Sequence, residues 1–266
     1  MKETRTVRGF LELVSAGALL VAVLTGPAAG QVTRRVSVDS GGVQGNRDSG
    51  YYDPSISADG RYVAFESSAT NLVGGDTNGF IDVFVRDRQS GTTERVSIDS
   101  GGIQGNDLSY EPSISADGRY VAFVSEATNL IVGDANGWYD VFIHDRQTGT
   151  TERVSVDSGG APGNRYSANP SISADGRYLA FRSGASNLVS GDTNGWDDVF
   201  VRDRQLVTTE RVSVSSGGMQ GDYPSFDPSI TNDGRYVGFA SSASNLVSGD
   251  TNSASDVFVR DRQSGT

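Results

Sequence analysis

The sequence predicts an all-β protein built from four copies of one antiparallel unit of four strands. The first observation is a repeat, because Pro54, Pro112, Pro170 and Pro228 open similar segments at a constant interval of 58 residues. The second is the pattern inside each copy, where short runs rich in Val, Ile, Phe and Tyr alternate with glycine-containing turns. A fixed period of this length is typical of one supersecondary unit duplicated in tandem.

The first copy predicts its four strands in chain order. Residues 55–57 form a short strand, and the Asp-Gly pair that follows supplies the positive φ angles of a tight hairpin. Residues 61–66 form the second strand, whose apolar side chains fall on both faces, as expected for a strand covered on both sides. Residues 82–87 form the third strand, and residues 93–99 form a fourth, more polar one.

The order of these strands predicts how the copies are arranged. A polar content that rises from the first strand to the last is expected of a blade that begins near an axis and ends at a rim, and such blades repeated radially form a β-propeller. Residues 33–39 repeat the sequence of a fourth strand, so we expect them to complete the last blade and close the ring. The predicted fold is a β-propeller of four four-stranded blades, with a segment of a longer array as the alternative.

The start of the chain has the pattern of a secretory signal peptide over residues 1–30. It combines a positively charged start, an apolar run over residues 13–24 and a small-residue cleavage site at residues 28–30. The apolar run is shorter than the roughly 20 residues that a bilayer span needs. We therefore expect cleavage after Gly30, a secreted or periplasmic protein without membrane insertion, and a single propeller over residues 31–266.

Composition limits the partners and the chemistry. The formal net charge is −11 at pH 7, which argues against nucleic acid or an anionic membrane surface as the partner. The sequence contains no cysteine, so disulfides cannot hold the exported product together.

The segment PSISADGRYVAF, followed by DVFVRD, resembles the WD40-like PD40 repeats of TolB-type propellers. The resemblance spans residues 54–266 in four copies. It implies the β-propeller fold and says little about ligands. The hydrolase domain that accompanies similar propellers in prolyl-oligopeptidase-like enzymes has no counterpart in this sequence.

An acidic motif, D-x-N-G-x-x-D with the glycine replaced in the fourth copy, occurs once in each copy and ends on the first residue of the third predicted strand. Calcium prefers six to eight oxygen ligands, and closely spaced carboxylate and amide side chains can supply several of them. In the alternative interpretation Asn-Gly makes a turn and the second Asp caps a strand. The fourth copy replaces this glycine by Ser253 yet keeps the three polar residues, which is one observation in favour of calcium. Both interpretations stay open, and calcium is the one cofactor that the sequence suggests. The candidate ligands are Asp76, Asn78, Asp82, Asp134, Asn136, Asp140, Asp192, Asn194, Asp198, Asp250, Asn252 and Asp256.

Catalytic motifs are scarce. The only histidine, His144, stands where the other copies have arginine, so we expect an exposed substitution at the rim. Without cysteine, and with Lys2 as the only lysine, Cys-His chemistry and a lysine nucleophile are excluded from the propeller. Paired carboxylates remain, as in glycosidases, but here the acids recur symmetrically, whereas a catalytic site normally breaks repeat symmetry. We predict no catalytic residue, and the alternative is a polysaccharide-active glycoside hydrolase or lyase.

The long connections are the expected binding surface. In an antiparallel blade, residues 67–81 and residues 100–111 emerge on the same side of the disc, and long loops on a rigid scaffold usually carry function. We expect a non-catalytic binding or scaffold protein that engages a protein or a surface glycan there, with calcium stiffening the loops. A purely structural surface module is a third possibility. The candidate ligand-binding residues are Gln104, Asn106, Tyr110, Trp138 and Trp196.

Overall fold

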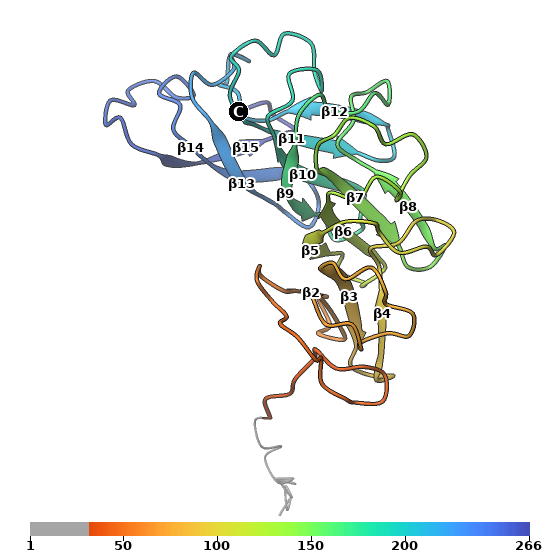
Figure 1. Ribbon diagram of the computed structural model, residues 1–266. Helices are drawn as coiled ribbons and strands as arrows, with labels where there is room; N and C mark the ends of the chain where they lie inside the picture. Colours follow the sequence, from red (N-terminus) through yellow and green to blue (C-terminus); the bar gives the residue numbers. More distant parts are fainter. Residues whose placement is uncertain (1–31) are drawn as a thin grey trace, which may run out of the picture. The chain divides into compact units, whose positions relative to one another are not determined.

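The computed structural model describes residues Val32–Thr266, of which Arg35–Thr266 form one compact unit (Figure 1). The predicted signal segment, residues 1–30, lies outside the described residues. The described part of the chain contains fifteen β-strands. It has no helix that is long and apolar enough to cross a membrane.

The strands form four antiparallel sheets, and within each sheet the spatial order follows the chain order. The first sheet comprises β1 (Ser55–Ile56), β2 (Tyr62–Ser67), β3 (Asp82–Asp87) and β4 (Thr92–Arg95). The second comprises β5 (Ser109–Ile114), β6 (Tyr120–Ser125), β7 (Asp140–Asp145) and β8 (Thr150–Arg153). The third comprises β9 (Ser167–Ile172), β10 (Tyr178–Ser183), β11 (Asp198–Asp203) and β12 (Thr208–Arg211). The fourth comprises β13 (Ser225–Ile230), β14 (Tyr236–Ser241) and β15 (Asp256–Asp261).

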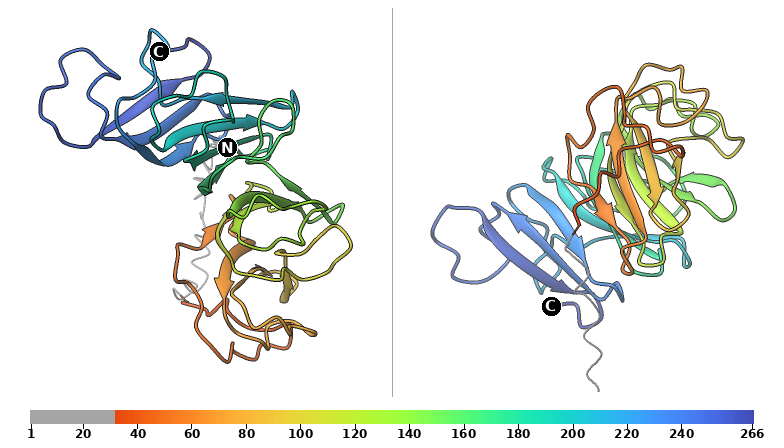
Figure 2. Two further views of the ribbon diagram at one scale, coloured as in Figure 1. Left: turned by 45° about the horizontal axis from the view of Figure 1, so that its top comes forward. Right: turned by 90° about the horizontal axis from the view of Figure 1, so that it is seen from below.

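This arrangement confirms the predicted all-β fold of four propeller blades with a 58-residue repeat. The first strands of the blades are the inner ones, since β1 contacts β5, β5 contacts β9, and β9 contacts β13 (Figure 2). The fourth strands, β4, β8 and β12, lie at the opposite edge of their sheets. The rise in polar content from the first strand to the last therefore follows the path from the axis to the rim.

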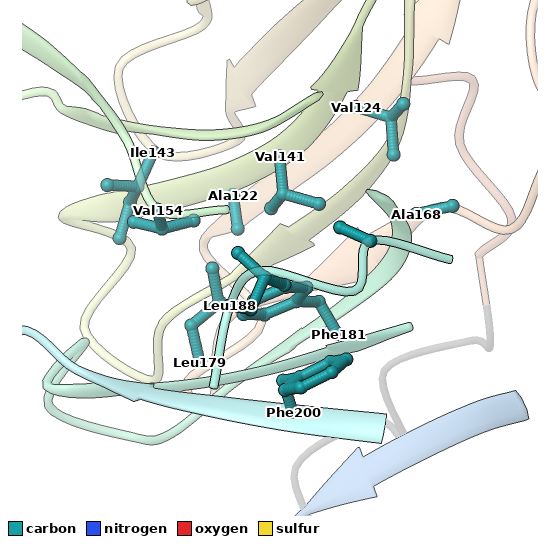
Figure 3. Close-up of a cluster of buried hydrophobic side chains, with 11 residues drawn as sticks. Ala122, Val124, Val141, Ile143, Val154, Ala168, Leu179, Phe181, Leu188 and Phe200 are labelled. Atoms are coloured by element: carbon teal, nitrogen blue, oxygen red, sulfur yellow. The ribbon is translucent and has the colours of Figure 1, made fainter. Parts of the chain in front are cut away.

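The core lies between successive sheets. In the cluster of Figure 3, Val141 and Ile143 of β7 pack with Leu179 and Phe181 of β10 and with Phe200 of β11. All five side chains are at most 1% exposed. The second and third strands have apolar residues on both faces because the second and third sheets are each covered by a neighbouring sheet on either side.

A tyrosine joins each blade to the next on the side of the short hairpin turns. The ring of Tyr62 lies over Gly118 of the following blade and contacts two guanidinium groups, with Arg61 at 4.7 Å and Arg146 at 4.4 Å from its centroid. Arg146 also forms an ion pair with Glu94 and donates to the carbonyl oxygen of Gly118. These two cation–π contacts hold the ring in place. Tyr120 and Tyr178 repeat the arrangement over Gly176 and Gly234.

A second repeated contact ties the two hairpins of each blade. In the second blade Arg119 donates Nε and Nη2 to the two carboxylate oxygens of Asp145, at 2.9 and 2.6 Å. Asp145 also accepts the backbone N–H of Gln147. The guanidinium of Arg119 holds the pKa of the Asp145 carboxyl well below its usual range.

One part of the predicted fold is wrong. Residues 33–39 were expected to form the fourth strand of the last blade, but that sheet has three strands within the described residues. The segment lies instead against the first blade, where the Thr93 hydroxyl donates to the Val38 carbonyl at 2.5 Å and the Thr93 N–H donates to the Ser40 hydroxyl at 3.0 Å. Val257 and Val259 of β15 are accordingly 81% and 66% exposed.

The reason is visible in the other blades. In the second blade the Thr151 hydroxyl donates to the Ile98 carbonyl, and the Thr151 N–H donates to the Ser100 hydroxyl, so the preceding loop makes the same two hydrogen bonds. The residues that follow a fourth strand thus dock on the rim of the next blade, and Val38 and Ser40 make that contact for the first blade. For the same reason β4 ends at Arg95 and not at residue 99, because the chain after it leaves β3 to reach the next blade.

We predict that Gly118→Ala destabilises the protein more than Gly133→Ala does. Both glycines have a positive φ, 74° and 80°, so both substitutions carry the strain of a side chain in that conformation. A Cβ at residue 118 would lie 2.1 Å from the Tyr62 ring, whereas a Cβ at residue 133 meets nothing. The additional clash should cost about 1–3 kcal/mol. Urea denaturation of both variants measures the difference, and equal losses would contradict the inter-blade role of Tyr62.

We also predict that the Arg119–Asp145 pair contributes to acid sensitivity. The pKa of Asp145 is lower in the folded state than in the unfolded chain, so its stabilisation is present above the unfolded value of about 3.9 and is lost as the pH falls toward the folded value. Denaturation curves between about pH 5 and pH 2 should show a weaker pH dependence for Asp145→Asn than for the native chain. Arg119→Gln is the control, since it removes the cause of the shift and should flatten the same range.

Candidate functional site

The long connections gather on one side of the blades, as the sequence predicts. We call this side the long-loop face; it comprises residues 68–81, 126–139, 184–197 and 242–255 between second and third strands and residues 99–108, 157–166 and 215–224 between blades. Loops of the two kinds are hydrogen-bonded to each other: Asn129 donates its side-chain amide to the Gln104 carbonyl, and the Asn106 N–H donates to Asn129 Oδ1. The face is therefore a connected surface.

Two of the predicted ligand-binding residues, Gln104 and Asn106, form hydrogen bonds to neighbouring loops of this face. Gln104 donates Nε2 to the Thr77 hydroxyl at 2.8 Å. Asn106 donates Nδ2 to the Thr128 hydroxyl and accepts the Thr128 N–H, at 3.0 and 2.9 Å. Their side chains hold loops together and have little hydrogen-bonding capacity left for a ligand.

The acidic motifs hold an arginine in the first three blades. In the second blade Arg153 Nη1 lies 2.9 Å from Asp134 Oδ1 and 2.8 Å from Asp140 Oδ2, and Ser155 donates to the other oxygen of Asp140. Burial raises the pKa of Asp134, while Arg153 opposes that shift. Asn136 donates Nδ2 to Asp140 at 2.7 Å and thus braces the loop. Arg95 and Arg211 stand in the same way between Asp76 and Asp82 and between Asp192 and Asp198, with Asn78 and Asn194 as the matching amides.

The fourth motif differs. Asn252 donates to Asp256 as in the other blades, at 3.1 Å, and within residues 32–266 no guanidinium reaches Asp250 or Asp256. These three side chains line a pocket of about 440 Å³ beside β15. Over the same residues no group of three or more Asp, Glu or His side chains has an arrangement suited to a metal ion.

A second pocket, of about 340 Å³, lies at the inner strands and is lined by all four blades. We call it the axial pocket; its residues are Tyr52, Asp53, Glu111, Pro112, Asn169, Pro170, Asp227 and Pro228. The polar members occupy one repeat position, immediately before the proline that opens each copy. Because β5, β9 and β13 begin at the long-loop face, this pocket lies near the same face.

The backbone of the axial pocket is strained. Glu111, Asn169 and Asp227 have φ of 54°, 52° and 52°, values that residues other than glycine rarely adopt. The pairing of the first strand with the second shifts register at the same place in all three blades. A bulge of this kind turns side chains away from the regular alternation, and such strain clusters at functional sites.

Two glutamates link the blades around this pocket. Glu66, which is buried, accepts the N–H of Tyr52 at 2.5 Å and the N–H of Glu111 at 3.1 Å. Glu111 in turn accepts the N–H of Asn169 at 2.7 Å. Burial raises the pKa of Glu111, and the Asn169 N–H opposes that shift. Asp53 and Asp227 make no such bond within the described residues, so their carboxylates are available to a ligand.

The predicted aromatic residues lie on the same face. Tyr110 stacks on Tyr52 at the edge of the axial pocket, with ring centroids 5.3 Å apart, and burial raises the pKa of Tyr110. Trp138 and Trp196 are 44% and 43% exposed. Trp196 stacks on Tyr223 at 5.6 Å. The structure thus brings Tyr110 to the pocket and leaves both tryptophans on the open surface.

Blade three carries a polar cluster that its sister blades lack. Asp197 accepts Arg182 Nε at 2.7 Å and the Tyr166 hydroxyl at 2.8 Å. The position of Arg182 is occupied by Glu66, Val124 and Ala240 in the other copies. This cluster was missed from the sequence, as was the row of residues before the prolines. In both cases the sequence feature that could have identified these residues is a repeat position whose residue type differs between copies.

His144 is buried, at 4% exposure, and not exposed as expected. Its Nδ1 lies 2.9 Å from the Thr151 hydroxyl, where Arg202 of the next blade donates to Thr209. Burial lowers the pKa of His144. The imidazole therefore replaces one arginine hydrogen bond in the interior of the blade.

Comparison with known proteins identifies the fold. No family model matches the chain, and no curated protein matches it. Among solved structures, a protein assigned as TolB from Agrobacterium tumefaciens superposes with a TM-score of 0.51 at 18% identity over 80% of this chain and 62% of its own. TolB from Acinetobacter baumannii gives 0.48 at 17% identity over 83% and 42%, and an oligogalacturonate lyase in complex with manganese gives 0.46 at 13% identity over 81% and 51%.

The chain spans 42% and 62% of the two TolB chains, so these likenesses concern the propeller. At such identities they establish the fold alone, and the Agrobacterium structure carries that conclusion. Together with the repeat of PSISADGRYVAF and DVFVRD, the superposition shows that the chain has the fold of TolB-type β-propellers.

Proposed function

We propose that the chain is an exported, non-catalytic binding module that holds a protein or glycan ligand on its long-loop face, with the axial pocket as the specific site. The observation that carries the proposal is the strained row of Glu111, Asn169 and Asp227, three non-glycine residues with positive φ in one pocket. Elsewhere on the face the described residues with positive φ are glycines, with Ser253 as the exception. Backbone strain at the same repeat position in three blades is expected where it directs side chains into a binding site.

The chemistry of the pocket suits hydrogen-bond donors. Asp53 and Asp227 are free to accept, Asn169 contributes an amide, and Tyr52 with three prolines contributes apolar surface. Hydroxyl, ammonium or guanidinium groups of a ligand fit such a lining. The formal net charge of −11 disfavours polyanions. Export to the periplasm or the extracellular space is proposed from the charged and apolar pattern of residues 1–30.

The test is a binding screen of the native chain against immobilised neutral, uronic and amino oligosaccharides and against basic and neutral peptides. We expect saturable binding to at least one class. The double substitution Asp53→Asn with Asp227→Asn should weaken it about tenfold or more, because two charge-assisted hydrogen bonds are weakened. Asp107→Asn is the control on the same face outside the pocket. Equal affinity of the pocket variant and the control would refute the axial site.

A polysaccharide-active enzyme is the second candidate, favoured by the cluster of Tyr166, Arg182 and Asp197, which breaks the repeat symmetry. A tyrosine hydroxyl, a guanidinium and a carboxylate in mutual contact are groups that acid–base chemistry can use. Incubation with a panel of polysaccharides should release neither reducing ends nor unsaturated sugars. Product formation that disappears in Tyr166→Phe would replace the binding proposal by the enzymatic one.

For the acidic motifs we propose that arginine, and not calcium, balances the carboxylates of the first three blades. Arg153→Met should lower the free energy of unfolding by about 3–5 kcal/mol, because it leaves two buried carboxylates unpaired. The melting temperature of the native chain should be the same in calcium and in chelator. A melting temperature that rises with calcium would instead support the metal sites, since a ligand of the folded state stabilises it.

A further inference from the structure

Three successive blades present an aromatic side chain at one position of the long-loop face. The three residues are Phe80, Trp138 and Trp196, each four residues after the first Asp of its acidic motif. Their side chains are 37%, 44% and 43% exposed. The fourth copy has Ala254 there. We propose that this aromatic row is a platform for the sugar rings of a neutral polysaccharide chain that crosses blades one to three. This inference rests on the proposed binding function and names its ligand class.

The loop backbone that carries the rings is held in place by hydrogen bonds within the protein. The backbone N–H groups of Phe80, Trp138 and Trp196 donate to the side-chain oxygen of the asparagine two residues earlier, at 3.1, 3.2 and 3.1 Å. Each asparagine also donates to the aspartate that begins the third strand. The loop that carries the ring is thus tied to the blade, and binding needs little ordering of the protein.

Tyrosines support the two tryptophans. Trp196 stacks on Tyr223 with an interplanar angle of 19°. Trp138 is tilted against Tyr166 at 6.4 Å, and Tyr166 stacks in turn on Tyr139 at 5.1 Å. Each indole therefore has a partner ring and still remains nearly half exposed, and such rings offer rigid, amphipathic contact area at a low entropic cost.

The surroundings of the row favour a sugar over a protein. The carboxylates that neighbour the two tryptophans in the sequence are already paired, Asp134 and Asp140 with Arg153, and Asp197 with Arg182. The loops that carry the rings are rich in Gly, Asn and Thr, whereas the centre of a protein interface is usually a contiguous apolar patch. A pyranose has apolar C–H faces that can lie on an indole and a rim of hydroxyls that suits neutral amides.

The net charge of the chain favours some classes of sugar polymer over others as the ligand of the aromatic row. A net charge of −11 repels a uronate polymer, and Arg153 and Arg182 are already paired with carboxylates. An amino-sugar polymer would be drawn to the acidic axial pocket rather than to the row. A neutral chain of pyranoses remains as the ligand class that fits exposed rings among neutral hydrogen-bonding groups.

The experiment uses the fact that Trp138 and Trp196 are the only tryptophans of the chain, so selectively excited tryptophan emission reports on these two rings of the row. The full chain is titrated with neutral cello- and xylo-oligosaccharides, with oligogalacturonate, with chitosan oligosaccharides and with a basic peptide. We expect a saturable change of emission with a neutral oligosaccharide and none with oligogalacturonate. An emission change with oligogalacturonate, or with the peptide alone, overturns the inference.

Variants separate ring contact from general damage. Trp138→Ala and Trp196→Ala should each weaken binding of the neutral oligosaccharide about tenfold, as expected for anchor residues. Trp138→Phe retains a ring and should lose far less. Ile103→Ala and Met219→Ala remove exposed apolar side chains outside the row and serve as controls. Loss of binding in these controls to the same degree as in Trp138→Ala would contradict the row.

The two proposals fail differently. If the neutral sugars leave the emission unchanged while a peptide binds in a manner sensitive to Asp53→Asn with Asp227→Asn, the aromatic row is refuted and the axial site stands. If no probe binds at all, both fall. A gain of affinity for a long neutral oligosaccharide in Ala254→Trp, which would add a fourth ring, is the result that only the row explains.

Discussion

Packing of successive sheets face to face is the constraint on which the rest of the structure depends. A strand such as β6, with Val121, Phe123 and Val124 all buried, cannot sit at the surface of an isolated blade. Its apolar faces are covered only when the next blade is present, so the blades stabilise one another in sequence. The tyrosines that lie over Gly118, Gly176 and Gly234 hold successive blades together on the side of the short hairpin turns. The hydrogen-bonded long loops hold them together on the opposite side.

Much of the blade structure was predictable because the same pattern of strands and turns occurs in four copies. The interval of 58 residues, the Asp-Gly hairpins and the doubly apolar second strand lead to the blades directly. The fate of residues 33–39 was not predictable in the same way, since one sequence serves both as a fourth strand and as the loop that docks on the next rim. Strand propensity is the same for either use, and only the contact of Thr93 with Val38 and Ser40 decides.

The candidate site shows the opposite balance. Motifs that recur from copy to copy, the Gln104 and Asn106 loop and the acidic motifs, are conspicuous in the sequence, yet the structure uses them to hold loops and, in the first three blades, to pair with arginine. The axial pocket is built at a position that changes from Asp53 to Glu111, Asn169 and Asp227. Sequence reasoning missed it because a bulge and a positive φ, which bring these side chains to one place, have no composition signature outside glycine.

The guanidinium groups that balance the acidic motifs and clamp the tyrosines have a practical consequence. Every cation of these contacts is an arginine, and Lys2 is the sole lysine of the sequence. Guanidinium remains protonated far beyond the pH at which an ammonium group would lose its charge. The paired interior should thus tolerate strongly alkaline media, and reagents directed at primary amines would find no side-chain target anywhere in the blades.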